Sequence, residues 1–260
     1  MTEYMFERHP ADQELARLQM IEEALDPVTI PHLETTGLRS GDRCLELGAG
    51  AGSIMKWMGE VVGASGRVVG VDRDTRYIQH LADPPFQIIE GNFPDLKLDE
   101  LFDLVHCRYV LIHNRTSPEI LKNLCRHLRP GGCLIAEEPD FTSAKLLTRT
   151  GDAARQRVNN AICRMFENLG LNPGYGLELP RKVAAEGLQV VATDARLHLA
   201  RGGSPMGRMM AASQQTLAAK LVATGEVTEA EIEEYVRDSQ HSESWTIYYC
   251  TVSVVASNRA

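Results

Sequence analysis

The sequence has no apolar run that approaches the roughly 18 residues a membrane-spanning helix needs. Its six cysteines never form a C-x-x-C pair, and residues 1–15 are too polar and acidic for a signal or transit peptide. A zinc site, a disulfide framework and a membrane span are therefore not expected. We interpret the cysteines as reduced core residues and predict a cytoplasmic protein without a membrane partner.

Clustered positive charge is also lacking. The 27 Lys and Arg residues are outnumbered by 35 Asp and Glu residues, which gives a formal net charge of −8. A protein that binds nucleic acid must neutralise phosphates with clustered Lys and Arg side chains. We therefore expect no nucleic-acid partner, and a small molecule is favoured instead.

The composition predicts a hydrophobic core of ordinary size. The chain has 260 residues, of which 43% are hydrophobic and 24% charged, as in a typical globular protein. We expect a single α/β domain over residues 1–260 that carries an insertion. Short apolar runs alternate with helix-length segments in the first half, which is typical of a doubly wound parallel sheet. The predicted strands are residues 43–48, 67–72, 86–90, 102–107 and 133–138.

Segments outside these strands are predicted mainly as helices. Residues 1–37 are expected to form N-terminal helices, the first of which ends at Asp26-Pro27. Two further strands are predicted at residues 188–200 and 244–257. The intervening segment, 200–243, is too long for a hairpin loop and is predicted as a helical insertion. Its second helix begins at a capping box made by Thr228 and Glu231.

The first predicted strand runs into a glycine-rich loop, CLELGAGAGSI, at residues 44–54. Glycines at such a loop let the backbone turn sharply and approach a ligand closely. A dinucleotide-binding loop would place its third glycine or alanine three residues after the second, where this sequence has Ser53. The spacing of Gly48, Gly50 and Gly52 therefore disfavours, without excluding, a nicotinamide-dependent oxidoreductase.

Glu46 lies just before the first of these glycines. A carboxylate repels a pyrophosphate but attracts an ammonium or sulfonium group. This favours S-adenosylmethionine over NAD as the ligand of the loop. The alternative is that Glu46 is only hydrogen-bonded to neighbouring backbone.

The pattern E-x-G-x-G-x-G after a first strand resembles the cofactor loop of class I S-adenosylmethionine-dependent methyltransferases. Asp72, 20 residues beyond Gly52, matches the acid that binds the ribose in that family. Three more segments match in order: EGNF at 90–93, FDLVHCRYVLIHN at 102–114 and LCRHLRPGGCLIAEEPD at 124–140. The resemblance covers residues 38–140, the expected cofactor-binding core. It implies a Rossmann-like, seven-stranded sheet in the order 3-2-1-4-5-7-6, with the last strand antiparallel.

The resemblance also implies roles for individual residues. Gly48, Ala49 and Gly50 would line the methionine part of the cofactor, with Glu46 near its amino group. Asp72 would hold the ribose hydroxyls, which suits a carboxylate with two acceptor oxygens. The product of the reaction would be S-adenosylhomocysteine.

The adenine would lie near the ends of the second and third strands. Arg73 is interpreted either as a group over the adenine or as a solvated charge. Asn92 stands where the family commonly has an aspartate, and its amide oxygen can still accept from the adenine amino group. Phe93 would pack on the adenine or in the core.

Four further residues are candidates by position. Arg108, at the end of the fourth strand, is expected near the cofactor, with a structural salt bridge as the alternative. His113 is the candidate general base, because imidazole titrates near neutral pH; the alternative is a histidine that orders its loop. His106 is predicted to be a core histidine. Tyr4 could cover the cofactor as part of a lid.

The pattern of the whole chain is similar to that of bacterial methyltransferases acting on small molecules, often in secondary metabolism. Insertions and N-terminal helices in that family usually cover the substrate, so the resemblance implies cap helices at residues 1–37 and a substrate cap at residues 200–243. We expect methyl transfer to an oxygen of an apolar or aromatic acceptor, without a metal, by a monomer or homodimer. An N- or C-methyltransferase is an alternative. A further alternative is a relative that binds the cofactor without methylating, either pericyclase-like or regulatory.

Overall fold

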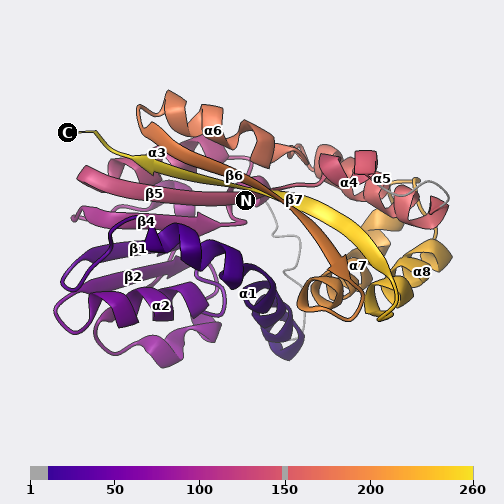
Figure 1. The fold of residues 1–260 in the computed structure, drawn as a ribbon, viewed down its shortest axis with the longest axis horizontal. Coiled ribbons are helices and arrows are strands. Elements are labelled where there is room, and N and C mark those ends of the chain that lie inside the picture. The colour runs from indigo at the N-terminus through magenta and orange to yellow at the C-terminus, as the bar shows by residue number, and fades with distance from the viewer. Residues whose placement is uncertain (1–10, 148–151, 260) are drawn as a thin grey trace. The chain divides into compact units, whose positions relative to one another are not determined.

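The computed structural model describes residues 11–147 and 152–259, in which the strands form a seven-stranded sheet ordered β3-β2-β1-β4-β5-β7-β6 (Figure 1). This confirms the predicted fold and strand order. The strands are β1 (Arg43–Leu47), β2 (Arg67–Asp72), β3 (Phe86–Glu90), β4 (Phe102–Arg108), β5 (Leu128–Asp140), β6 (Gln189–Arg201) and β7 (Trp245–Ser257).

Neighbouring strands β1 to β5 pair in parallel, so their carboxyl ends meet at one edge of the sheet. The last strand, β7, is antiparallel to its neighbours β5 and β6. The amide of Gly131, early in β5, donates to the carbonyl of Asn258 just after β7, at 2.7 Å. The amide of Gly202, just after β6, donates to Ser244 just before β7, at 2.8 Å. In each contact, a residue near the end of one strand pairs with a residue near the beginning of the neighbouring strand in the sheet. Antiparallel pairing requires this arrangement.

The fifth strand begins at Leu128, five residues earlier than predicted. The sequence Pro130-Gly131-Gly132 is typical of a turn, and Gly131 has a left-handed φ of 79°, yet the backbone still pairs with Asn258. The register with β4 shifts at this point, between Phe102 and Leu104. The strand therefore continues through a local irregularity instead of reversing in a turn, because its pairing with Asn258 holds it in the sheet.

The described residues divide into two compact units. Unit 1 comprises residues 11–24, 139–147, 152–177 and 195–252, and unit 2 comprises residues 25–138, 178–194 and 253–259. The prediction of one domain over residues 1–260 is not tested by this division.

Unit 2 contains the parallel strands and most of the shorter helices. Its helices include α2 (Ser53–Val62) and α3 (Ser117–Arg126), and four short 3-10 helices η1 to η4 lie at Thr75–Tyr77, Gln79–Leu81, Phe93–Asp95 and Leu111–His113. Met55, Met58 and Val62 of α2 pack with Leu104 and Ile135 of the sheet. Helix α6 (Tyr175–Ala185) crosses the boundary between the units.

Unit 1 contains the predicted insertion. Residues 200–243 include α7 (Pro205–Val222) and α8 (Glu229–Gln240), which pack on each other and on α5 (Ala153–Asn168), as seen in Figure 1. The capping box of Thr228 and Glu231 is present at the start of α8. The shorter helix α4 (Thr142–Leu147) also packs on α5. The insertion is therefore helical as predicted, and its role as a substrate cap stays a prediction.

The N-terminal prediction was wrong in one respect. A single helix, α1 (Ala11–Glu34), continues through Pro27 and Pro31, whereas the sequence predicted an end at Asp26-Pro27. Each proline removes one helical hydrogen bond. Within unit 2, the last part of α1 is held in place because Leu25, Val28 and Leu33 are buried. Tertiary packing here outweighs the cost of the prolines.

None of the helices that the structure describes is both long and apolar enough to cross a membrane. All six cysteines are free. Within residues 11–147 and 152–259, no group of three or more His, Cys, Asp and Glu side chains is arranged to hold a metal ion.

Candidate functional site

The glycine loop connects β1 to α2 at the carboxyl edge of the sheet, in unit 2. Gly48, Gly50 and Gly52 all have positive φ angles, of 73°, 58° and 96°. A Cβ atom at Gly48 would lie 2.3 Å from Cγ2 of Val110, which follows β4. Both the backbone conformation and the close approach of Val110 therefore require glycine at position 48.

Asp72, at the end of β2, lies against this loop. Its Oδ2 accepts from the Gly50 amide at 3.0 Å, and its Oδ1 accepts from the Asp74 amide at 3.1 Å. Burial raises the pKa of Asp72, and these backbone donors act in the opposite direction. The structure thus brings together the loop and the acid that the sequence separated by 20 residues.

Glu46 is buried and paired with a histidine. It lies directly opposite His106 in the pairing of β1 with β4, and its Oε2 is 2.7 Å from Nδ1 of His106. Burial raises the pKa of Glu46, and His106 acts against that rise. His106 is itself fully buried, as predicted. Its pKa is raised to about 9, because flanking Glu46 and Glu137 outweigh the effect of burial.

Glu137, on β5, is the centre of a second set of contacts. Its Oε2 accepts from the Thr29 hydroxyl at 2.5 Å, and its Oε1 accepts from the Ser253 hydroxyl at 2.7 Å. Nδ1 of His32, on α1, lies 3.2 Å from the same Oε1. The surrounding donors and cations hold the pKa of this buried carboxyl well below its usual range.

Arg108 joins the end of β4 to α1 within unit 2. Its Nη2 donates to Oδ1 of Asp26 at 2.9 Å, and its Nη1 donates to the Thr29 hydroxyl at 2.8 Å. These contacts are those of a structural salt bridge, the alternative that the sequence left open. A role of Arg108 beside the cofactor stays a prediction.

The segment after β4 is held by a buried carboxyl. Glu138 accepts from three consecutive backbone amides, those of Val110, Leu111 and Ile112, at 3.0, 2.7 and 3.0 Å. Burial raises its pKa to about 8, although these donors act in the opposite direction. Tyr109, just before them, has a positive φ of 58°, which is uncommon for a residue other than glycine. The backbone is thus tightly constrained where β4 meets the carboxyl edge.

His113 ends the short helix η4 that this carboxyl holds, and it is half-buried. The structure therefore places the candidate base in the segment that also contacts Gly48 through Val110. Whether His113 removes a proton is a question of chemistry and stays a prediction.

The remaining candidates are spread along the same edge of unit 2. Ala49 is buried in the core cluster, and Phe93 is also buried. Arg73 is exposed, and so is Asn92, whose amide nitrogen donates to Asp95 at 2.9 Å. Tyr4 lies outside the described residues. The structure thus leaves the predicted adenine contacts untested.

Sequence reasoning missed the residues that support the predicted ones. Glu137 and Glu138 directly follow the apolar run of residues 133–136 in β5, and this pair of adjacent acids was the signal available. Thr29 and His32 carried no comparable signal, because their partners lie more than 100 residues away in the sequence.

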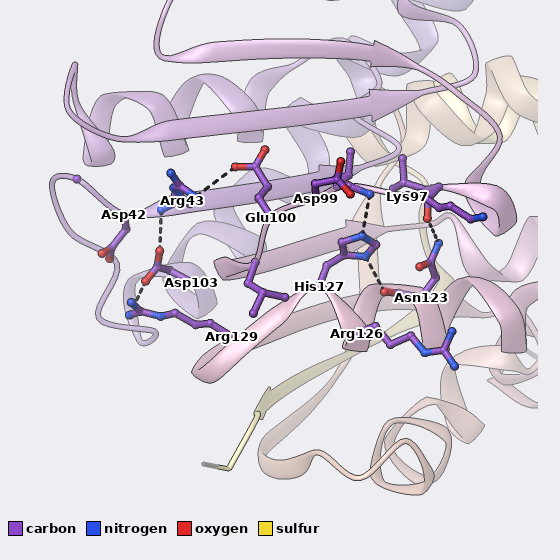
Figure 2. A pocket seen from close by; sticks show the side chains of 14 residues that line it. Asp42, Arg43, Lys97, Asp99, Glu100, Asp103, Asn123, Arg126, His127 and Arg129 are labelled. Atoms are coloured by element: carbon purple, nitrogen blue, oxygen red, sulfur yellow. Dashed lines mark hydrogen bonds and ion pairs between the residues drawn. The ribbon is translucent and has the colours of Figure 1, made fainter.

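A groove of about 950 Å³ lies elsewhere in unit 2, where β1 and β4 begin. Figure 2 shows that two ion pairs, Arg43 with Glu100 and Arg129 with Asp103, lie along it. Arg43 donates from its backbone to Asp103 at 2.8 Å, and Nε2 of His127 accepts from the Leu98 amide at 3.2 Å. Because strands β1 and β4 are parallel, this groove lies at the opposite edge of the sheet from the glycine loop. It is not the predicted cofactor site.

Comparisons with known proteins agree with this geometry. The model of a family described as a methyltransferase domain matches residues 17–173. An uncharacterised 37.1 kDa protein of a Streptomyces fradiae transposon is 26% identical over 160 residues, which is 56% of this chain and 46% of that protein. A ubiquinone/menaquinone biosynthesis C-methyltransferase of Pseudomonas paraeruginosa is 28% identical over 130 residues, 46% of this chain and 51% of the relative. The chain thus spans about half the length of these curated relatives.

Solved structures show the same fold at low sequence identity. A Haemonchus contortus phosphoethanolamine N-methyltransferase has a TM-score of 0.60 at 12% identity, covering 96% of this chain and 58% of that one. The [4+2]-cyclase SpnF has a TM-score of 0.59 at 17% identity, covering 90% and 81%. The family model covers more than half of the sequence, including the glycine loop, Asp72 and the segment after β4. The chain therefore belongs to the methyltransferase-domain family, as its resemblance to class I S-adenosylmethionine-dependent methyltransferases predicted.

Proposed function

We propose that this chain transfers the methyl group of S-adenosylmethionine to an oxygen atom of a small apolar or aromatic acceptor of the natural-product type. The observation that carries the proposal is the contact between the glycine loop and Asp72, whose carboxylate is oriented by the amides of Gly50 and Asp74. At this edge of unit 2, a ligand can approach the backbone of the glycine loop closely, and the Asp72 carboxylate is oriented to accept hydrogen bonds from hydroxyl groups.

The residues present fit the cofactor in the chemistry of their groups. Glu46 supplies negative charge for an amino group, and Asp72 supplies two oxygens for vicinal hydroxyls. Gly48, Ala49 and Gly50 leave the loop backbone accessible at the methionine part. Asn92 and Phe93, with Arg73, are the candidates around the adenine. When bound, the cofactor supplies an electrophilic methyl group on a sulfonium centre.

The task of the protein is then to position the acceptor and to remove its proton. In-line positioning in a site that excludes water lowers the barrier without covalent catalysis. His113, in the constrained segment after β4, is the group proposed to accept the hydroxyl proton. Glu138 supports it indirectly by holding the amides of residues 110–112.

Transfer to carbon is a second candidate. The C-methyltransferase relative is 28% identical over about half of this chain, which supports it. A carbon acceptor activated by a neighbouring hydroxyl would also need that proton removed, so His113 would serve either reaction. Transfer to nitrogen and a non-methylating role have only the fold likeness in their favour. The monomer or homodimer, the cytoplasmic location and a place in secondary metabolism also stay predictions.

The test is formation of S-adenosylhomocysteine by the purified chain with three acceptor panels: phenols, amines and hydroxylated quinols. Mass spectrometry and NMR of the products then identify the methylated atom. We expect turnover with phenols and an O-methyl product. A C-methyl product would replace the oxygen assignment with the second candidate. Binding of S-adenosylhomocysteine without turnover on any panel would favour a non-methylating relative.

A further inference from the structure

Glu46 and His106 form a buried pair that the proposed cofactor chemistry does not explain by itself. They are direct neighbours across β1 and β4, with Nδ1 and Oε2 2.7 Å apart. The exposed fractions of Glu46 and His106 are 4% and 0%. A buried carboxylate is costly unless it is paired and hydrogen-bonded, and His106 supplies both conditions.

His106 has a second carboxylate on its other side. Its Nε2 lies 3.7 Å from Oε2 of Glu137, within ion-pair range. Glu137 is itself fixed by Thr29, Ser253 and His32. An imidazole between two carboxylates is stabilised in its charged form, which agrees with its pKa of about 9. At neutral pH His106 is therefore an imidazolium.

The other charged groups of the cluster give Glu46 little alternative support. Arg108 lowers the pKa of Glu46 less than His106 does, and Asp26 raises it. The guanidinium of Arg108 is bound to Asp26 and Thr29. Without the charge on His106, burial would favour the protonated form of Glu46. The ionisation of Glu46 thus depends mainly on His106.

We propose that His106 is a positioning residue that keeps Glu46 ionised and oriented, so that Glu46 can bind the α-amino group of the cofactor's methionine part. The inference rests on the proposed function, because it takes Glu46 as the partner of that amino group. It assigns to a core histidine a selective role in recognising one functional group of the ligand. All the residues involved lie in unit 2.

A purely structural role for the pair predicts a different result. If His106 only stabilises the sheet, its replacement weakens binding of every ligand at this edge to the same extent. If it keeps Glu46 ionised, replacement weakens only ligands that carry the amino group. Two ligands that differ in that group separate these roles.

The experiment compares S-adenosylhomocysteine with its deamino analogue, in which hydrogen replaces the α-amino group and the carboxylate is kept. Affinities are measured by calorimetry at pH 7 for the wild type, His106→Asn and His106→Gln. We expect each variant to lose about tenfold in affinity for S-adenosylhomocysteine, the size of one charge-assisted contact, and less than twofold for the analogue. His127→Gln is the matched control, since His127 is also buried in unit 2 but lies at the groove of Figure 2.

The pH dependence gives a second readout. In the variants, affinity for S-adenosylhomocysteine should rise more steeply with pH than in the wild type, because loss of the His106 charge raises the pKa of Glu46 further. Affinity for the deamino analogue should show the same pH dependence in all the proteins. A structural role alone would not produce this change of profile.

The outcomes are distinct. Equal losses for both ligands would overturn the role of His106 and leave the proposed function intact. Failure of the wild type to bind S-adenosylhomocysteine would overturn the proposed function itself. If neither variant folds, nitrogen-15 NMR of the wild type decides: one histidine must stay doubly protonated at pH 8, and its absence would overturn the proposal.

Discussion

Oε2 of Glu46 and Nδ1 of His106 are 2.7 Å apart, although 60 residues separate them in the sequence. The parallel register of β1 and β4 places the two residues side by side, immediately before the glycine loop on one strand and before Arg108 on the other. A buried pair of titratable groups therefore lies inside the sheet, next to the glycine loop. This edge of the sheet offers several positions at which single substitutions have distinct, measurable consequences.

Gly48→Ala should destabilise unit 2 by about 2–4 kcal/mol. A left-handed conformation costs an alanine about 1 kcal/mol or slightly more, and the clash with Val110 adds about 1–3 kcal/mol. Gly37→Ala is the control, because Gly37 has almost the same φ, 74°, with no atom within 4 Å of a Cβ. It should cost only about 1 kcal/mol. Urea unfolding of both variants checks the difference, and equal losses would contradict the role given to Val110.

Asp72→Asn should weaken binding of S-adenosylhomocysteine, because the amide loses one acceptor oxygen and the negative charge. The side chain keeps its shape, so the fold should persist. A ligand that binds only the folded state raises the melting temperature, and we expect that rise to shrink to a fraction of the wild-type value. NAD should give no rise with either protein.

Asp74→Asn is the matched control for this measurement. Asp74 is two residues away and makes an ion pair with Arg76 on the surface. Its replacement should leave the ligand-induced rise unchanged. If both variants lose the rise equally, Asp72 has no special place at the cofactor.

The strands were predictable because buried parallel strands are nearly continuous apolar runs, bounded here by glycines and prolines. The loop and Asp72 were predictable because their chemistry depends on spacing along the chain. The continuity of α1 was not predictable, because its two prolines favour an end of the helix. Only the packing of α1 in the folded chain determines that the helix continues.

The contacts between buried charged residues could not be predicted from the sequence either. His106 could be placed in the core from its strand position, but its partners could not be named. Glu137 and Glu46 come from strands on either side of β4, so their meeting depends on strand order and register. Such pairings are properties of the sheet and leave no local signal in the sequence.

The unfolding free energy should fall as the pH rises from 5 to 6.5. Burial raises the pKa of Glu138 to about 8, so the folded protein keeps a proton that the unfolded chain, with an ordinary pKa of about 4.3, has released. Stability therefore decreases with pH in this interval, by up to about 1.4 kcal/mol per pH unit from this group. Glu138→Gln cannot titrate and should show a flatter dependence.

The interval is chosen because His106 contributes in the same direction only above its ordinary pKa of about 6.5, up to about 9. Urea unfolding of the wild type and of Glu138→Gln at four pH values checks the slope. Parallel curves for the two proteins would mean that Glu138 is ionised throughout, and that its three amide contacts outweigh the effect of burial.

His113→Ala should lower turnover far more than cofactor affinity. A positioned general base contributes about a hundredfold or more to the rate, and His113 lies in the segment that Glu138 holds rigid after β4. With an acceptor that requires proton removal, we expect at least a hundredfold loss of turnover and less than a twofold change in the dissociation constant of S-adenosylhomocysteine. His80→Ala is the control, because His80 is exposed in η2 and should change neither quantity. Unchanged turnover in His113→Ala would remove it from the reaction, whereas parallel losses of turnover and affinity would mean that it only orders its loop.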